Sequence, residues 1–252
     1  MRPRDKTYDL DEPVIRVRDL HIAFGGHPVL DGFDLTLYRR EDLAVLGKSG
    51  SGKSVLIKCI IGLLQPDSGS IEVLGNVVSD LEHQALDRVR ARVGFLFQSN
   101  ALYDSMTVRK NLEFPLRRHW VRLTPAEAED RVMEALGNVG LAETVDMMPS
   151  ELSGGMRKRV ALARTLILRP EIILYDEPTT GLDPITSREI GDLMVEISEK
   201  YRTSSIIISH DMNCVERTSE NVAVLLRGKC HALGSVEELR RLDDPEVRRF
   251  FE

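Results

Sequence analysis

The chain has 252 residues, a formal net charge of −6, and 42% hydrophobic, 29% charged and 5% aromatic residues. This composition fits one large soluble domain or a core domain with an inserted subdomain, and the acidic balance argues against a nucleic-acid partner. The three widely spaced cysteines lack metal-ligand spacing and predict reduced thiols, and no stretch approaches the ~18 apolar residues of a membrane helix.

Strands and a buried helix are predicted for the first hundred residues. The polar residues 1–13 predict a flexible lead-in rather than a signal peptide, and a domain follows over 14–252. Apolar residues alternate with polar ones over 15–24 and 33–37, which predicts antiparallel strands. A short apolar strand at 42–47 precedes a glycine-rich loop and a buried helix over 55–64, and further strands are predicted at 68–75 and 92–98.

The pattern changes to helical periodicity from about residue 99 to 150, with Pro115, Pro125 and Pro149 as predicted boundaries. Thr124 with Glu127 predicts a helix N-terminus. Together with the next helix, which extends to about residue 169, this region is predicted to be an inserted α-helical subdomain.

Two continuous apolar runs, 171–177 and 204–210, are typical of strands buried on both faces of a parallel sheet. The helix predicted between them over 184–200 makes them a βαβ unit. A hairpin over 221–234 and a helix over 235–242 complete the prediction. The fold class is therefore α/β.

The segment GKSGSGKS at 47–54 fits the phosphate-binding pattern G-x-x-x-x-G-K-[ST]. Glycines let backbone N–H groups surround phosphate oxygens, Lys53 reaches the β and γ phosphates, and the Ser54 hydroxyl coordinates Mg²⁺. The alternative, an ordinary glycine-rich turn, is disfavoured because a predicted strand precedes the loop and a predicted helix follows it. The predicted nucleotide-binding residues here are Gly47, Lys48, Ser49, Gly50, Ser51, Gly52, Lys53, Ser54 and Val55.

Asp176 and Glu177 end the first of the two buried apolar runs. Ligands of α/β sheets bind at this end of the strands, so Asp176 is predicted to bind Mg²⁺ and Glu177 to polarise the attacking water. The alternative is a solvated acidic turn before Pro178. That alternative loses weight beside the phosphate-binding loop.

The stretch ELSGGMRKRV at 151–160 places Ser153 and two glycines, Gly154 and Gly155, before a basic helical run. A serine at a helix start is most simply an N-cap, although its hydroxyl and the free N–H groups also suit a phosphate. With GLDP at 181–184 and ISH ending at His210, these motifs resemble the ATP-binding cassette (ABC) family over nearly the whole chain.

The resemblance implies the P-loop ABC ATPase fold, with a mixed sheet, an N-terminal antiparallel β subdomain and the inserted helical subdomain. It also implies that Ser153, Gly154 and Gly155 grip the γ-phosphate of ATP bound to a second subunit. An ATPase homodimer that uses ATP and Mg²⁺ follows from this arrangement.

Four further roles are implied by the same resemblance. Phe24 would stack on adenine, Gln98 would contact Mg²⁺ and the attacking water, Asp183 would cross the dimer interface, and His210 would sense the γ-phosphate. Simpler alternatives are a core position for Phe24 and His210 and a surface position for Gln98. The lack of an NKxD motif disfavours a GTPase.

The subfamily is indicated by three segments: ALYDSMTV at 101–108, FPLRRH at 114–119 and LSGGMRKRVALAR at 152–164. They resemble the ATPase subunits of Mla-type, MCE-associated phospholipid transporters, although that family more often has Phe at Tyr103 and Glu at Arg118. The resemblance implies integral membrane permease subunits, an MCE-domain lipid-binding protein, and a peripheral position on the cytoplasmic face of the inner membrane.

Three alternatives remain open. The chain is an ABC ATPase for amino acids, metals or drugs, or a non-transport ABC protein of DNA repair or translation, or an idle regulatory cassette. A long coiled-coil insertion and a second cassette are missing, and intact Lys53, Asp176, Glu177 and His210 argue against an idle cassette. The tail over 240–252 carries an apolar pair, Phe250 and Phe251, as a candidate docking signal for accessory subunits.

Overall fold

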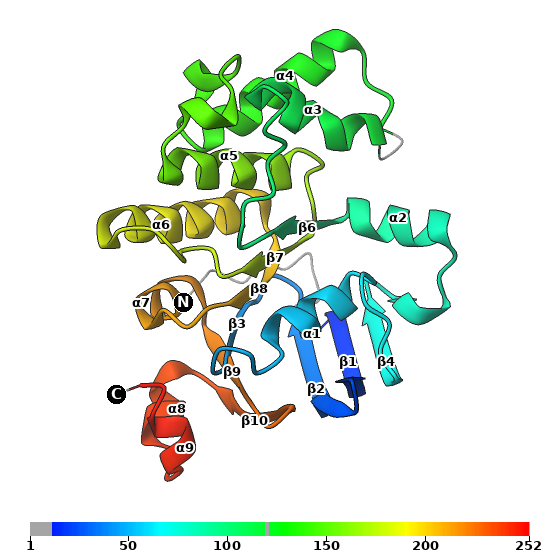
Figure 1. Ribbon diagram of the computed structural model, residues 1–252, viewed down its shortest axis with the longest axis vertical. Helices are drawn as coiled ribbons and strands as arrows, with labels where there is room; N and C mark the ends of the chain where they lie inside the picture. Colours follow the sequence, from blue (N-terminus) through cyan, green and yellow to red (C-terminus); the bar gives the residue numbers. More distant parts are fainter. Residues whose placement is uncertain (1–11, 119–120, 252) are drawn as a thin grey trace.

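The computed structural model describes residues 12–118 and 121–251, and its first strand belongs to a four-stranded antiparallel sheet (Figure 1). Residues 1–11 of the predicted lead-in lie outside the described residues, and Pro13 already belongs to the first strand. The strand order is β2-β1-β4-β5. The bounds are β1 (Pro13–Phe24), β2 (His27–Tyr38), β4 (Ser68–Val73) and β5 (Asn76–Val77).

The second sheet has six strands in the order β10-β9-β3-β8-β7-β6. Its neighbours pair in parallel except β10, which forms an antiparallel hairpin with β9. Every residue of β3, β7 and β8 is buried, as expected for parallel strands covered on both faces. The bounds are β3 (Asp42–Leu46), β6 (Val93–Leu96), β7 (Ile172–Asp176), β8 (Ser204–Ile208), β9 (Asn221–Leu226) and β10 (Lys229–Gly234).

Helices surround the parallel sheet unevenly. In Figure 1, α3, α4 and α5 form a separate layer at the top with α6 beside it, whereas α8 and α9 lie at the opposite end near the C-terminus. No helix within the described ranges is long and apolar enough to cross a membrane. The bounds are α1 (Lys53–Ile60), α2 (His83–Ala91), α3 (Val108–Arg118), α4 (Pro125–Asn138), α5 (Gly154–Leu166), α6 (Pro184–Tyr201), α7 (Met212–Thr218), α8 (Val236–Arg241) and α9 (Pro245–Arg248).

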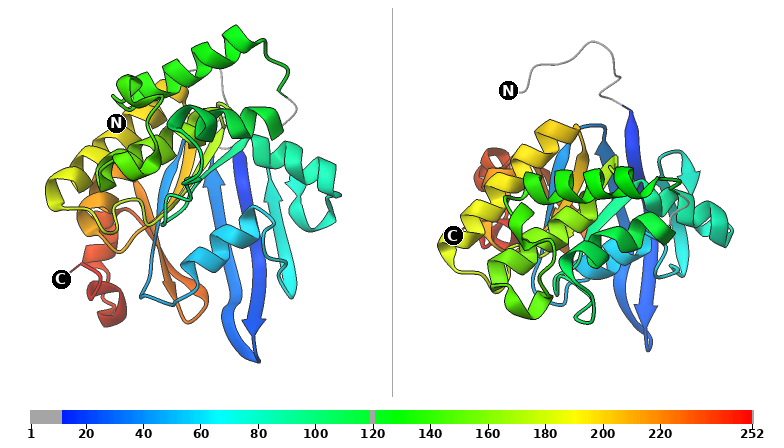
Figure 2. Two further views of the ribbon diagram at one scale, coloured as in Figure 1. Left: turned by 45° about the horizontal axis from the view of Figure 1, so that its top comes forward. Right: turned by 90° about the horizontal axis from the view of Figure 1, so that it is seen from above.

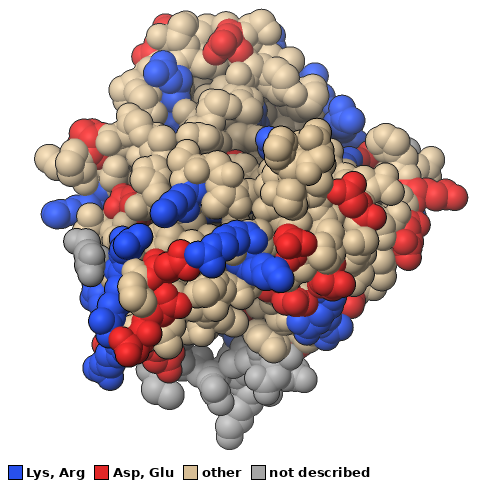
Figure 3. Space-filling model, turned by 60° about the horizontal axis from the view of Figure 1, so that its bottom comes forward, with Lys and Arg blue, Asp and Glu red and all other residues tan. Residues whose placement is uncertain are grey.

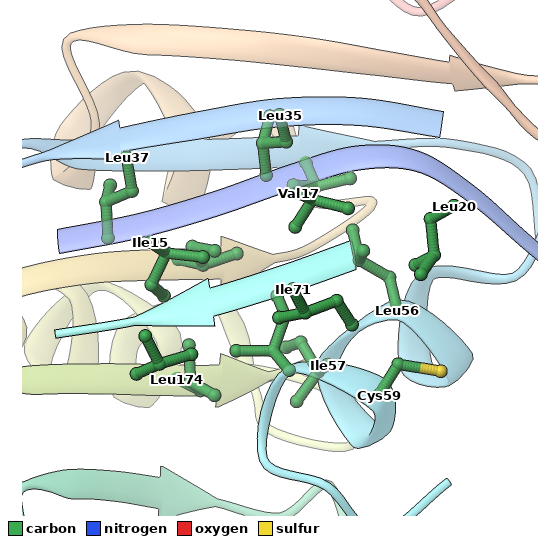
Figure 4. Close-up of a cluster of buried hydrophobic side chains, with 14 of the residues drawn as sticks. Ile15, Val17, Leu20, Leu35, Leu37, Leu56, Ile57, Cys59, Ile71 and Leu174 are labelled. Atoms are coloured by element: carbon green, nitrogen blue, oxygen red, sulfur yellow. The ribbon is translucent and has the colours of Figure 1, made fainter. Parts of the chain in front are cut away.

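Three apolar clusters hold these layers together. The first lies between the two sheets around α1, where Ile15 and Val17 of β1, Leu56 and Ile57 of α1 and Leu174 of β7 converge (Figure 4). The second joins α3–α6 to the other face of the parallel sheet, and the third packs α7–α9 against β3 and β9. The helical layer therefore shares an apolar core with the parallel sheet. Figure 2 shows the helices of this layer and the sheet from two further sides.

Ion pairs add to the contact between the sheets at the surface. Arg39, which follows β2, pairs with Glu12 at 2.7 Å and with Glu171 at 3.5 Å, and Arg92 pairs with Glu171 at 2.6 Å. On the face shown in Figure 3, acidic and basic side chains lie side by side. Exposed pairs of this kind contribute about 0–1 kcal/mol each, so the apolar clusters dominate stability.

The predicted fold is confirmed, with one local error in the helical region. Thr124 and Glu127 form the predicted capping box at the start of α4. Pro115 does not end a helix as predicted but lies inside α3. Proline fixes a helical φ and removes one N–H donor, and the buried face of α3, with Leu112 and Leu116, packs into the second cluster and offsets that loss.

Candidate active site

The glycine-rich loop over 47–52 connects the buried end of β3 to α1. Gly52 is the N-cap of α1 with φ 103°, a conformation that favours glycine. A Cβ atom at Gly52 would also lie 2.8 Å from the Val29 side chain, so β2 leaves no room for one. The loop's backbone shape therefore depends on the glycine at this position.

A pocket of about 600 Å³ opens over this loop. It brings together most of the predicted catalytic and nucleotide-binding residues from β3, α1, β6, β7 and β8. Ser51 is the exception within the loop: it does not line the pocket, and its buried hydroxyl has no hydrogen-bond partner in the part of the chain that the structure describes. The lining residues are Val29, Leu46, Gly47, Lys48, Ser49, Gly50, Gly52, Lys53, Ser54, Val55, Gln98, Glu177, His210, Met212 and Phe250.

Lys53 is buried and points into the loop. Its Nζ donates hydrogen bonds to the carbonyl oxygens of Gly47 at 2.7 Å and Lys48 at 3.1 Å, and lies 4.0 Å from Glu177 Oε1. Burial lowers the pKa of Lys53, while the charges of Glu177 and Asp176 oppose that change. An anion in the loop would offer this ammonium group a better partner than neutral carbonyls.

Ser54 and Asp176 join α1 to the end of β7. The Ser54 hydroxyl donates to Asp176 Oδ1 at 2.9 Å, and burial raises the pKa of Asp176 although this hydrogen bond opposes the rise. No group of three or more His, Cys, Asp or Glu side chains able to hold a metal occurs within 12–118 and 121–251. The two oxygens do fit Mg²⁺, which commonly binds one or two protein oxygens together with phosphate oxygens and water.

Glu177 and His210 meet because β7 and β8 are neighbours. The Glu177 backbone N–H donates to Ile208 O at 2.9 Å, which places the residues after the two strands side by side. The His210 Nδ1 and Glu177 Oε2 atoms are 2.7 Å apart, and the Thr180 hydroxyl donates to the same oxygen at 3.1 Å. Glu177 itself has φ 51°, a left-handed conformation that is uncommon outside glycine and is found at functional sites.

His210 and Phe24 are not core residues, contrary to one alternative for each. The side chain of His210 is 65% exposed, and Phe24 at the end of β1 is 48% exposed. Gln98, two residues beyond β6, is exposed and lines the pocket. Phe24 does not line it.

The residues from the second half of the predicted site lie elsewhere in this chain. Ser153 is the N-cap of α5 and accepts a hydrogen bond from Met156 N at 3.2 Å. Gly154 is open to its surroundings, whereas a Cβ at Gly155 would lie 2.7 Å from the Thr186 side chain. These residues do not line the 600 Å³ pocket.

Asp183 is also placed by a helix start rather than by the pocket. Its carboxylate accepts hydrogen bonds from Ile185 N and Thr186 N, each at 3.0 Å, as the N-cap of α6. The Thr186 hydroxyl and these N–H groups lower the pKa of Asp183, so its carboxylate is ionised at neutral pH.

Some site residues had no signal in the sequence. Met212 and Phe250 line the pocket, but an apolar side chain gives no chemical indication of such a position. Lys158 is buried on α5 and donates to Gln98 O at 3.1 Å, and burial lowers its pKa to about 8. Its place in the basic run Arg157–Arg159 does not distinguish it from its neighbours.

Comparison with known proteins identifies the family. The model of the family described as ABC transporter matches residues 30–180. A probable ribonucleotide transport ATP-binding protein, mkl, from Mycobacterium tuberculosis is 39% identical over 250 residues, which cover 99% of this chain and 69% of the relative. The methionine import ATP-binding protein MetN from Rhizobium etli is 39% identical over 225 residues, which cover 89% of this chain and 62% of MetN.

Solved structures show the same fold. The dimeric ATP-binding cassette MJ0796, bound to ADP and Pi, is 28% identical with a TM-score of 0.81 and covers 88% of this chain and 98% of its own. The protein cbiO1 from Clostridium perfringens, part of the transporter complex cbiONQ, is 29% identical with a TM-score of 0.82, covering 95% and 99%. The family model and a 39% identical relative agree with the geometry. The chain therefore belongs to the ABC transporter family and is the ATP-hydrolysing component of a transporter.

Proposed function

We propose that this chain powers a transporter of phospholipid or a related lipid between membranes, bound to permease subunits at the cytoplasmic face of the inner membrane. The support is the resemblance of 101–108, 114–119 and 152–164 to Mla-type ATPases. In this region Tyr103 is exposed, and its ring packs on Phe114 with 4.9 Å between centroids. His119, the last residue of the second segment, lies outside the described residues. An MCE-domain protein completes the proposed assembly.

The active unit is proposed to be a dimer of cassettes. The phosphate-binding loop lines the pocket, whereas Ser153 and Gly154 are exposed at the start of α5 and do not line it. A second copy would supply its Ser153 hydroxyl and helix N-terminus to the phosphates bound by the first. The dimeric arrangement of the similar cassette MJ0796 supports this proposal.

The observation that carries the chemical proposal is the contact of Glu177 with both His210 and Lys53 beside the loop. Lys53 exchanges the loop carbonyls for phosphate oxygens, and Glu177, held by His210 and Thr180, orients the attacking water. Gln98, Ser54 and Asp176 are the residues that would hold Mg²⁺. This ion neutralises charge on the phosphate oxygens when it is bound.

Replacing Glu177 with Gln tests these roles. The change is isosteric, so ATP binding stays intact and an ATP-dependent dimer accumulates, while phosphate release falls by about 100-fold or more. Glu171→Gln is the matched control, because Glu171 precedes the same strand but pairs with Arg92 outside the pocket. Full turnover by Glu177→Gln contradicts the proposed role.

The names of the similar proteins favour a second candidate, import of a ribonucleotide or of methionine. Purification with the native membrane subunits and reconstitution into vesicles separate the two. We expect ATP-dependent transfer of a fluorescent phospholipid between vesicles, absent with Glu177→Gln. ATP-dependent uptake of methionine or a ribonucleotide without lipid transfer supports the second candidate instead.

A further inference from the structure

Side chains of helix α5 hold the loop that follows β6 by hydrogen bonds to the main-chain carbonyls of that loop. Lys158 Nζ donates to Gln98 O at 3.1 Å. Six residues further along the same helix, the Arg164 guanidinium donates to Asn100 O at 2.9 Å and to Ala101 O at 2.8 Å. Two cationic side chains on one helix therefore bind three of the four carbonyls from Gln98 to Ala101.

The loop needs such support because its backbone is unusual. Asn100 and Ala101 are consecutive non-glycine residues with φ 64° and 50°. Left-handed conformations of this kind persist only where surrounding contacts hold them, and alanine has no side-chain polar group to help. Arg164 binds the carbonyls of both residues, so it supports the loop at its most strained point.

Lys158 is buried and Arg164 is half-buried, so neighbouring side chains restrict both cations. Only 2% of Lys158 is exposed, and it lies on a helix whose Val160 and Ala161 belong to the second apolar cluster. The Arg164 guanidinium lies 6.0 Å from the centroid of the Tyr103 ring. Because the two side chains are fixed relative to α5, the loop carbonyls that they bind keep their position relative to that helix.

We propose that Lys158 and Arg164 are positioning residues that place Gln98 for hydrolysis and tie its position to the helix that begins after Ser153. The inference rests on the proposed role of Gln98. When the N-terminus of α5 engages the phosphates of a second copy, the same rigid helix sets the Gln98 loop, so hydrolysis follows dimer closure.

Lys158→Met and Arg164→Met test the inference. Methionine keeps most of the aliphatic stem and removes the donors. Because the loop shifts, kcat falls about 10- to 100-fold, while ATP affinity is unchanged since the phosphate-binding loop is untouched. Arg164→Lys, which restores a cationic donor, recovers part of kcat.

Arg90→Met is the matched control. Arg90 also donates to two successive carbonyls, Ile61 O and Gly62 O, both at 2.9 Å, but it joins α2 to the end of α1. Its loss affects urea stability and leaves kcat unchanged. An equal fall of kcat in Arg90→Met shows a general effect of lost stability and overturns the inference, as does unchanged kcat in both Lys158→Met and Arg164→Met.

A double-mutant cycle with Gln98→Ala separates this inference from the proposed role of Gln98. If the two cations act through Gln98, their replacement costs little further activity once Gln98 is gone. The same fold-loss in both backgrounds overturns the inference while the role of Gln98 stands. A normal kcat in Gln98→Ala alone refutes the role of Gln98, and the inference with it.

Discussion

Asn111 is a fully buried amide whose replacement by aspartate gives a quantitative test of the helical region. It is 0% exposed, and its Oδ1 accepts a hydrogen bond from Tyr103 N at 2.8 Å. Its Nδ2 group donates to Tyr103 O, Met106 O and Thr107 O at 3.0–3.1 Å. One side chain therefore closes the loop that leads into α3.

Asn111→Asp keeps the shape of the side chain and its acceptor but removes both N–H donors. Each net hydrogen bond lost from a buried site costs about 1–1.5 kcal/mol, which gives about 2–3 kcal/mol for the two donors. An ionised carboxylate facing three carbonyl oxygens adds its own burial cost, so about 4 kcal/mol is expected at pH 8.

The pH dependence has a definite sign. Burial without a positive partner raises the folded-state pKa of the introduced carboxyl group above its unfolded value. The ionisation penalty is therefore absent below the unfolded pKa of about 3.9 and grows as the pH rises through the folded pKa. Asn111→Asp should accordingly lose less stability at pH 5 than at pH 8.

Urea unfolding of Asn111→Asp at both pH values measures these quantities. Asn76→Asp is the control, because the half-buried Asn76 amide also bonds two carbonyls, Val73 O and Leu74 O, but in a surface turn. We expect a loss of about 1 kcal/mol for the control at either pH. An Asn111→Asp protein as stable as wild type at pH 8, or a loss equal to the control's, refutes the reasoning.

Three further outcomes are expected. Gly155→Ala should lower the free energy of unfolding in urea by about 1–3 kcal/mol, because its Cβ would meet the Thr186 side chain. Gly154→Ala has open space and should stay within about 0.5 kcal/mol of wild type. Equal losses in the two variants contradict this packing. Thr124→Ala should cost about 1 kcal/mol through loss of the capping box of α4, and an unchanged urea midpoint would argue against it. Burial raises the pKa of the thiols of Cys59, Cys214 and Cys230 to about 11. At pH 8 a disulfide reagent should therefore label these thiols quickly only after the protein unfolds.

Sequence patterns predicted the fold best where burial is continuous. The apolar runs that became β7 and β8 predicted parallel neighbours, and this is confirmed. Helix α2 was not predicted, because only Val89 among its nine residues is buried and no apolar face is visible in the sequence. Helix α7, with seven residues, was not predicted either.

The candidate site could likewise be predicted where its residues form local motifs in the sequence. The loop over 47–54 and the pair Asp176–Glu177 are local motifs, and the adjacency of β7 and β8 accounts for the contact with His210. The sequence offers Phe250 as a candidate docking signal, but in the structure it lines the pocket, and with Phe251 it packs on this chain's own third cluster. The position of Phe250 depends on the path of α8 and α9 through the fold, and the local sequence does not indicate it.

Binding and hydrolysis depend on different parts of this fold. Lys53, predicted to reach the phosphates, and Ser54, predicted to bind Mg²⁺, are carried by α1 and already form hydrogen bonds to Gly47 O after β3 and to Asp176 at the end of β7. Gln98 is carried by a loop whose carbonyls are held from α5, a helix with its core in the helical layer. On the proposed roles, a single chain can therefore retain ATP in its own pocket, whereas water is placed for attack only when α5 reaches the position set by a second copy.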